Sequence, residues 1–255
     1  MKIATCCPAC GGKELKFTPA VLVPFVAKRV FGWDTIKIDD MFVCSVCNTV
    51  HCLDCGMVFC DIRFDPEEAA RLYAGYWGEE YIKMREQYEH GYGERIWRIT
   101  SGIDRNPAIE WFLQKHLEFP VDILDWGGDT GEYTPFKDRS KKVHIYEIGS
   151  NPVVWGERID EPQPPYDLII LSNVLEHASY PMDILSDIVK VIGNALLYIE
   201  VPFVPSEFSV KTYWHEHINF FTEESVNRML SRCGLKMVSS NQLPPYYQVA
   251  CRKLP

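Results

Sequence analysis

Cysteines in closely spaced pairs are the residues near the start of the chain that are best suited to chemistry. Cys7 and Cys10 form one Cys-x-x-Cys pair, and Cys52 and Cys55 form another. Glycine follows each pair, which permits a tight turn in which backbone N–H groups face the sulfurs. Two such pairs supply four thiolates, the ligand set of a closed tetrahedral zinc site. We therefore expect these four cysteines to hold a structural zinc ion.

A third pair, Cys44 and Cys47, leaves the choice of ligands open. We prefer Cys52 and Cys55, because glycine follows Cys55 and the chain then continues into an apolar segment. The spare cysteines fit the alternative of small buried side chains. The sequence does not begin with an apolar secretory segment, so the pairs indicate metal rather than disulfides, and we expect a cytoplasmic protein.

The second group of candidate residues surrounds a glycine-rich turn that follows the apolar segment Val121–Leu124. Its glycines allow a sharp strand-to-helix turn and a close approach of the backbone to a ligand. An acid, Glu147, ends the next apolar segment, where it can accept hydrogen bonds from both hydroxyls of a ribose. Dinucleotide-binding proteins share these two features, so the pattern predicts a nucleotide-type ligand without selecting the cofactor.

Polar and titratable residues follow two further apolar segments. Ser172 and Asn173 come directly after the first segment, Asp167–Leu171. A Leu-Glu-His sequence follows them and ends at His177. The second segment is followed by a Tyr-Trp-His-Glu-His sequence that contains Glu216 and His217. These side chains are candidates for proton transfer, because neutral imidazole can take a proton near pH 7.

The pattern from Pro120 onward predicts an α/β sheet, since short apolar runs alternate with helical periodicity. We expect helices over Pro181–Ile192 and after the cap Thr222, and a helix capped by Asp65 in the connector. The division that we predict is a zinc-binding module at 1–62, a helical connector at 63–119 and the α/β domain at 120–255. The expected strands are Val121–Trp126, Val143–Ile148, Asp167–Leu171, Ala195–Glu200, Leu235–Ser239 and Tyr247–Cys251.

In their order along the chain, these motifs resemble the class I S-adenosylmethionine-dependent methyltransferases. The resemblance is narrower still to the branch with an N-terminal zinc-binding domain, which acts on nucleotide-linked deoxysugars and related small molecules. It implies a seven-stranded Rossmann-like sheet with the last strand antiparallel. It also implies S-adenosylmethionine as methyl donor, S-adenosylhomocysteine as product, and a small-molecule substrate that contains a sugar.

The resemblance implies roles for the residues around the glycine-rich turn. The turn would pass beneath the methionine part of the cofactor, with Asp125 near its ammonium group, and Glu147 would hold the ribose. Ser172 and Asn173 would line the face at which the methyl group is transferred. The turn residues that we expect to contact the cofactor are Gly127, Gly128, Asp129 and Gly131.

For the acceptor, the resemblance implies that His217 is the base and that Glu216 orients it. It also places His177 at the same opening of the active site. The alternative is that His215 and His217 merely alternate on a short strand and cap the sheet. Tyrosines of the connector would reach the site, and their spacing does not select one. The candidates are Tyr73, Tyr76 and Tyr81.

Charge and length restrict the partners. The formal net charge is −9, whereas nucleic-acid binding depends on clustered Lys and Arg, so nucleic acid is disfavoured as a substrate. The sequence has no run of 18 apolar residues, so we expect no membrane partner. The resembled sugar C-methyltransferases carry a further C-terminal domain and this sequence ends at Pro255, so O-methylation is weighed equally.

Two other interpretations stay open. One is an RNA or protein methyltransferase that docks its substrate on the zinc module. The other is a non-catalytic protein that retains the fold, against which the intact Gly127–Gly131 turn and Glu147 argue. Methylation of oxygen, nitrogen or carbon and the oligomeric state stay open as well.

Overall fold

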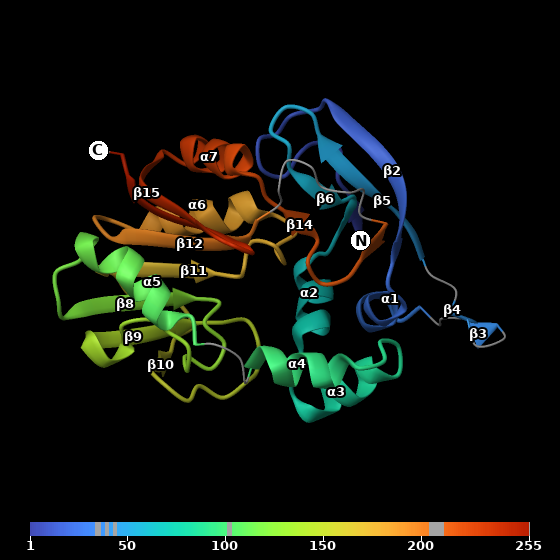
Figure 1. The fold of residues 1–255 in the computed structure, drawn as a ribbon, viewed down its shortest axis with the longest axis horizontal. Helices are drawn as coiled ribbons and strands as arrows, with labels where there is room; N and C mark the ends of the chain where they lie inside the picture. Colours follow the sequence, from blue (N-terminus) through green and yellow to red (C-terminus); the bar gives the residue numbers. More distant parts are fainter. Residues whose placement is uncertain (34–36, 39–40, 43–44, 101–103, 204–211, 255) are drawn as a thin grey trace.

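The computed structural model describes residues 1–33, 37–38, 41–42, 45–100, 104–203 and 212–254. Its largest sheet has seven strands in the order β10-β9-β8-β11-β12-β16-β15 (Figure 1). The first five strands run parallel, and β16 runs antiparallel to both of its neighbours, which confirms the predicted sheet. The strands are β8 (Val121–Trp126), β9 (Ser140–Tyr146), β10 (Glu157–Arg158), β11 (Leu168–Ser172), β12 (Leu196–Pro202), β15 (Leu235–Leu243) and β16 (Tyr246–Lys253).

Helices cover both faces of this sheet, because alternate residues of each buried strand point to opposite sides. On one side, Leu124 of β8 belongs to an apolar cluster with residues of α6 (Pro181–Val191) and α7 (Glu223–Arg232). On the other side, Ile123 packs with residues of α5 (Asn106–Leu113). This three-layer arrangement leaves the carboxyl ends of the parallel strands available for a ligand.

A second, five-stranded sheet contains strands from both ends of the chain. Its N-terminal strands are β2 (Leu15–Leu22), β5 (Ser45–Cys52) and β6 (Val58–Cys60). Strand β13 (Tyr213–Trp214) pairs in parallel with β2, and β14 (Asn219–Phe220) pairs antiparallel with β6. The loop between β13 and β14 therefore joins the two edges of this sheet, and its Ile218 N donates at 2.9 Å to the backbone oxygen of Glu176, in the segment that follows β11.

The connector consists of short helices that lie between the two sheets and below them in Figure 1. Asp65 caps the first of them: its side chain accepts a hydrogen bond from Glu68 N, and the Glu68 side chain accepts one from Asp65 N, each at 2.9 Å. These helices are α2 (Pro66–Tyr73), α3 (Glu79–Glu86) and α4 (Tyr92–Thr100). The remaining elements are α1 (Pro24–Phe31), β1 (Lys2–Ile3), β3 (Lys37–Ile38), β4 (Met41–Phe42), β7 (Ile62–Arg63) and the 3₁₀ turns Gln114–His116 and Lys137–Arg139.

The segment after the glycine-rich turn differs from the prediction. We expected the turn to open an α-helix, but residues 132–139 form only turns and the 3₁₀ turn Lys137–Arg139. Pro135 lies within this segment, and Phe136 has a left-handed backbone with φ 60°, a conformation that ends a right-handed helix.

Other expectations on the elements are confirmed. The helix from Pro181 and the helix capped by Thr222 are present, although several strand ends shift by one to four residues. Strand β10 is only two residues long, as the short link after β9 requires. No helix among the described residues is long and apolar enough to cross a membrane. The predicted division at residues 62 and 119 stays a prediction.

Candidate functional site

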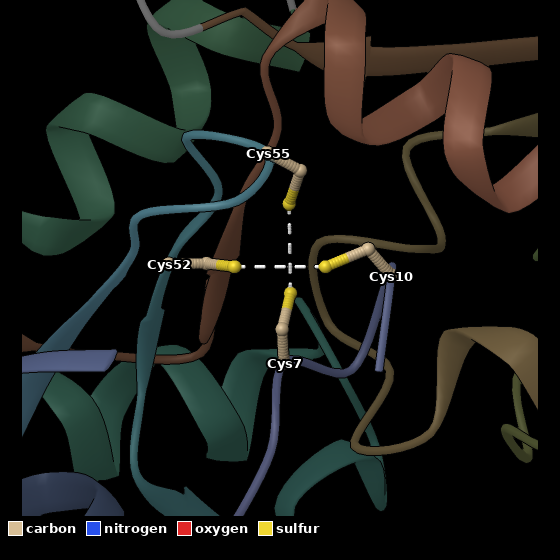
Figure 2. Close-up of side chains that lie close together, drawn as sticks. All are labelled: Cys7, Cys10, Cys52 and Cys55. Carbon is tan, nitrogen blue, oxygen red and sulfur yellow. Dashed lines mark hydrogen bonds between the residues drawn. The ribbon is translucent and has the colours of Figure 1, made fainter. Parts of the chain in front are cut away.

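Four cysteine side chains from two turns converge on one point (Figure 2). The sulfurs of Cys7 and Cys55 are 3.7 Å apart, and those of Cys10 and Cys52 are 3.5 Å apart. Tetrahedral zinc, with bonds of about 2.3 Å to sulfur, places its ligands about 3.8 Å apart. The donor atoms and their spacing therefore fit a zinc ion, and they belong to the four cysteines that we expected.

Backbone hydrogen bonds shape the two cysteine turns in the same way. Gly11 N donates to Cys7 O, and Gly56 N donates to Cys52 O, both at 2.9 Å. Both glycines have positive φ, which explains why glycine follows each pair.

The alternative ligand pair lies elsewhere. Cys47 of β5 belongs to a separate buried group with Cys60 and Asp61. Cys44 lies outside the described residues. The structure thus separates Cys47 from the four-cysteine group.

The glycine-rich turn is closely packed on both sides. Gly127 and Gly131 have φ values of 79° and 74°. A Cβ atom on Gly127 would lie 2.5 Å from Val174 Cγ2, and one on Gly131 would lie 2.0 Å from the backbone oxygen of Trp155. Side chains at these positions would displace neighbouring atoms, so glycine is required for this path of the chain.

Glu147 binds the glycine-rich turn directly. Its Oε2 accepts a hydrogen bond from Asp129 N at 3.2 Å, and its Oε1 accepts one from Gly149 N at 2.6 Å. The side chain of Asn151 donates to Asp129 Oδ1 at 2.9 Å and to the backbone oxygen of Tyr76 at 3.0 Å. One network therefore joins the turn, the acid and the connector.

Asp125 lies beneath the turn. A Cβ atom on Gly128 would lie 2.6 Å from Asp125 Cγ, so the carboxylate sits directly against the turn backbone. The hydroxyl of Thr134 donates to Asp125 Oδ2 at 2.6 Å. Burial raises the pKa of Asp125 to about 6. This acid supports the turn from below.

Ser172 and Asn173 are held by an acid that sequence reasoning missed. The Ser172 hydroxyl and the Asn173 amide both donate to Oε1 of Glu200, each at 3.1 Å. Arg105 also donates to this buried carboxylate, at 2.5 Å. In the sequence, Glu200 closes the apolar run Ala195–Ile199, as Glu147 closes Val143–Tyr146, so the signal used for Glu147 could have found Glu200.

His177 is fixed by the connector and by the loop after β13. Its Nδ1 lies 2.9 Å from the hydroxyl of Tyr73 and 3.2 Å from the backbone oxygen of Glu216. Its ring packs edge-on against that of His217, with centroids 4.5 Å apart. Burial lowers the pKa of His177 to about 4, so the ring is neutral at pH 7. Tyr73 is thus the connector tyrosine whose hydroxyl meets the histidines.

Glu216, which we expected to orient His217, is part of a buried ion pair. Arg85 of α3 donates to its two carboxylate oxygens at 2.9 and 2.6 Å, and His215 Nδ1 lies 3.2 Å from Oε2. Burial opposes ionisation, but His215 and Arg85 outweigh it and hold the pKa of Glu216 well below its usual value. No motif had singled out Arg85, because its partner lies far away in the sequence.

A comparison with protein families identifies the domain to which this fold belongs. Residues 84–240 match the family model described as a methyltransferase domain. No curated protein sequence matches the chain. The match covers more than half of the chain, which therefore belongs to the methyltransferase domain family. It is an S-adenosylmethionine-dependent methyltransferase.

Several solved structures are similar to the chain. One is a DhpI complex with S-adenosylhomocysteine, at 12% identity and TM-score 0.48, over 69% of this chain and 95% of that one. Another is the N,N-8-amino-8-demethyl-D-riboflavin dimethyltransferase RosA from Streptomyces davawensis. It is 13% identical with a TM-score of 0.48, over 69% of this chain and 60% of that one. A third is the [4+2]-cyclase SpnF, which is 10% identical with a TM-score of 0.47, over 58% of this chain and 80% of that one.

Proposed function

We propose that the chain transfers a methyl group from S-adenosylmethionine to a hydroxyl of a small acceptor, a sugar or a nucleotide-linked sugar. The observation that carries this proposal is the path of residues 173–177. Val174 packs against Gly127 of the turn, and His177 lies against His217. The short segment 173–177 therefore connects the glycine-rich turn, as the expected cofactor site, to the imidazoles of His177 and His217.

The residues around the turn fit the cofactor. The glycines of the turn allow the backbone to approach a ligand closely. Glu147, whose carboxylate lies against the turn, would accept hydrogen bonds from the ribose hydroxyls. When bound, the cofactor supplies an electrophilic methyl group on a sulfonium. We assign the cofactor to Asp125, Gly127, Gly128, Asp129, Gly131, Glu147, Ser172 and Asn173.

The face for methyl transfer is rigid. Asn173 has a left-handed backbone with φ 54°, and Glu200 holds both its side chain and that of Ser172. A non-glycine residue in this conformation costs free energy that the surrounding contacts must offset, a situation common at active sites. Methyl transfer is an in-line displacement, so fixed alignment contributes directly to its rate.

We assign His217 as the base that takes the proton of the acceptor hydroxyl. Arg85 and Glu216 fix the loop that carries it, and Tyr73 and the Glu216 carbonyl fix the neighbouring His177. A polyhydroxylated acceptor suits this end of the site, because the phenol of Tyr73 and the imidazoles of His177 and His217 gather there. The net charge of −9 disfavours RNA as the acceptor.

We propose that the four-cysteine group binds zinc in a structural role. Four thiolates complete the tetrahedral coordination of zinc and leave no position for a substrate or an activated water. The cysteine turns also contact α7 of the methyltransferase fold: the hydroxyl of Thr222 donates to Cys55 O at 2.6 Å.

The first experiment is calorimetry of S-adenosylmethionine binding to the zinc-loaded chain. Glu147→Ala should weaken binding by roughly 1–3 kcal/mol, as expected when a polar partner is removed. Glu161→Ala is the matched control, because this acid is exposed and lies outside the site. Absence of binding by folded wild-type protein would contradict the proposal.

The second experiment is a screen of sugar nucleotides for methyl incorporation. His217→Ala should retain cofactor binding and lose about 10²–10⁴-fold in turnover, the usual contribution of a general base. Incorporation into RNA or protein, with none into sugars, would overturn the assigned acceptor.

A further inference from the structure

We propose that Glu176, His177 and His217 form a binding site for a divalent transition-metal cation at the acceptor end of the active site. One carboxylate oxygen and one nitrogen of each imidazole all lie within 4.8 Å of one another. Two imidazoles and one carboxylate on one side of a cation are a recurrent ligand set for zinc and non-haem iron. This site is distinct from the four-cysteine group.

Glu176 gives independent evidence of a missing partner. Its side chain is 0% exposed, and neither carboxylate oxygen accepts a hydrogen bond from any residue that the structure describes. A buried carboxyl group without a partner is costly, and such groups in native proteins are normally paired or bound to a metal. The carboxylate reaches the two imidazoles, so a cation between the three groups would supply the partner.

The backbone of Glu176 is fixed so that its side chain stays at this point. Its carbonyl oxygen accepts hydrogen bonds from Ile218 N at 2.9 Å and from Asn219 N at 3.0 Å. These donors lie directly after His217, so the same hydrogen bonds hold two of the three ligands in register. The two ligand segments therefore cannot separate without breaking backbone hydrogen bonds.

His177 has the surroundings of a metal ligand. Its Nδ1 lies within hydrogen-bond distance of the Glu216 carbonyl and of the Tyr73 hydroxyl. Metal-binding histidines usually donate one ring N–H to a backbone carbonyl or a similar group, which leaves the other nitrogen to bind the ion. The contacts at Nδ1 thus assign Nε2 to the cation.

The donor chemistry selects the class of ion. Imidazole favours zinc, iron, cobalt and nickel over magnesium and calcium, which prefer all-oxygen ligands. Three protein ligands leave coordination positions open, as in catalytic rather than structural sites. A hydroxyl of the acceptor can occupy an open position.

The catalytic consequence, unlike the binding itself, rests on the proposed function. A cation held by Glu176, His177 and His217 would bind the acceptor oxygen and lower the pKa of its hydroxyl, and in that metal-bound form His217 would serve as a ligand, whereas in the metal-free form it is the base. The hydroxyl loses its proton to water, its oxygen forms a bond to the methyl carbon, and the methyl–sulfur bond breaks with its electron pair left on sulfur. The products are a methyl ether and S-adenosylhomocysteine.

The test is a titration of the zinc-loaded full chain with Co²⁺, followed by calorimetry and visible absorption. We expect one further equivalent of Co²⁺ to bind, without the intense sulfur-to-cobalt charge-transfer band that marks cysteine ligation. Glu176→Gln, which keeps the shape of the side chain, and His217→Ala should each weaken this binding at least about tenfold. Glu161→Gln, at an exposed acid, is the matched control and should bind as the wild type does.

Two outcomes would overturn the proposal. One is that the zinc-loaded wild type binds no Co²⁺ or Zn²⁺ beyond the cysteine site. The other is that Glu176→Gln binds Co²⁺ as tightly as the control. Far-UV circular dichroism and S-adenosylmethionine binding are measured on the same samples, so a misfolded variant is recognised. Failure of cofactor binding in the wild type would count against the proposed function and not against the cation site.

Discussion

At the scale of single residues, the buried ion pair of Arg85 and Glu216 should be sensitive to substitution. Arg85 is 1% exposed and donates to both oxygens of Glu216. Removal of one partner from a buried ion pair leaves an uncompensated charge, which costs about 3–5 kcal/mol. Arg85→Met should lower the free energy of unfolding by that amount in urea titrations.

A double variant separates loss of the ion pair from loss of packing. Arg85→Met combined with Glu216→Gln removes both charges, so it should be more stable than Arg85→Met alone. Equal stability of the single and double variants would show that the cost comes from packing. Either variant should also reduce turnover, since this pair fixes the loop that carries His217.

Asp125 should make stability depend on pH. Burial raises its pKa from 3.8 in the unfolded chain to about 6 in the folded one, so the folded state holds the proton more firmly. The stabilisation is complete below pH 4 and is lost as the pH rises through about 6. Asp125→Asn removes this loss, so its stability relative to wild type should rise by up to about 3 kcal/mol from pH 4 to 7.

Urea titrations at several pH values measure that difference. Asp187→Asn serves as the control, because Asp187 is exposed on α6. A difference between Asp125→Asn and wild type that stays constant from pH 4 to 7 would show that Asp125 titrates as an ordinary exposed acid.

At the scale of elements, the path of the glycine-rich turn depends on the absence of a side chain at Gly131. A Cβ atom here would lie 2.0 Å from a backbone oxygen, which cannot move as a flexible side chain can. Gly131→Ala should therefore cost about 1–2 kcal/mol for the left-handed backbone and about 1–3 kcal/mol more for overpacking. Cofactor binding should be lost with it.

Gly193 after α6 provides the comparison for that substitution. It also has a positive φ, of 51°, but a Cβ atom there would meet nothing within 4 Å. Gly193→Ala should cost only the backbone term and should leave the affinity for S-adenosylmethionine unchanged. Thermal unfolding and calorimetry of both variants check the difference, and equal effects would contradict the overpacking argument.

The elements that sequence patterns predicted are those with local signals. Buried strands such as β11 appear as apolar runs, and α7 has its cap at Thr222 and its stop at Gly234. By contrast, β13 pairs with β2, so Trp214 lies opposite Leu22, and no pattern near either residue indicates a partner so distant in the sequence. The same distance hid the pairing of Arg85 with Glu216.

The residues of the candidate site also fall into those with a local sequence signal and those whose contacts join distant elements. Glu147 was a candidate because an acid at the end of the apolar segment after a glycine-rich turn is a local pattern. The structure brings its side chain to Asp129 of the turn, and its role at the cofactor stays a prediction. The partners that fix the site act across elements: Glu200 of β12 binds Ser172, and Tyr73 of α2 lies against His177. The fold shows which acid and which of the candidate tyrosines make these contacts. Local sequence patterns therefore suggest candidate groups for chemistry, whereas the contacts that hold those groups in place are seen only in the fold.

At the scale of the whole molecule, the cysteine turns and the seven-stranded sheet share one apolar core. Cys52 and Met57 belong to the same buried cluster as Phe221, Val226 of α7 and residues of β12. Two side chains of the methyltransferase fold also bind the cysteine turns: Thr222 donates to Cys55 O at 2.6 Å, and Arg232 donates to Ala9 O at 2.5 Å. The two sheets are thus joined by packing and hydrogen bonds, which couples their stabilities.

A structural zinc ion contributes its binding free energy to folding, so loss of the proposed zinc site should destabilise more than the turns that form it. We expect Cys52→Ser to lower the temperature of one cooperative unfolding transition and to increase hydrogen exchange in α7 as well as in the cysteine turns. Cys6→Ser is the matched control, since Cys6 is exposed and outside the four-cysteine group. If exchange rises only in the cysteine turns while α7 stays protected, the shared core does not transmit the loss, and the zinc module unfolds independently.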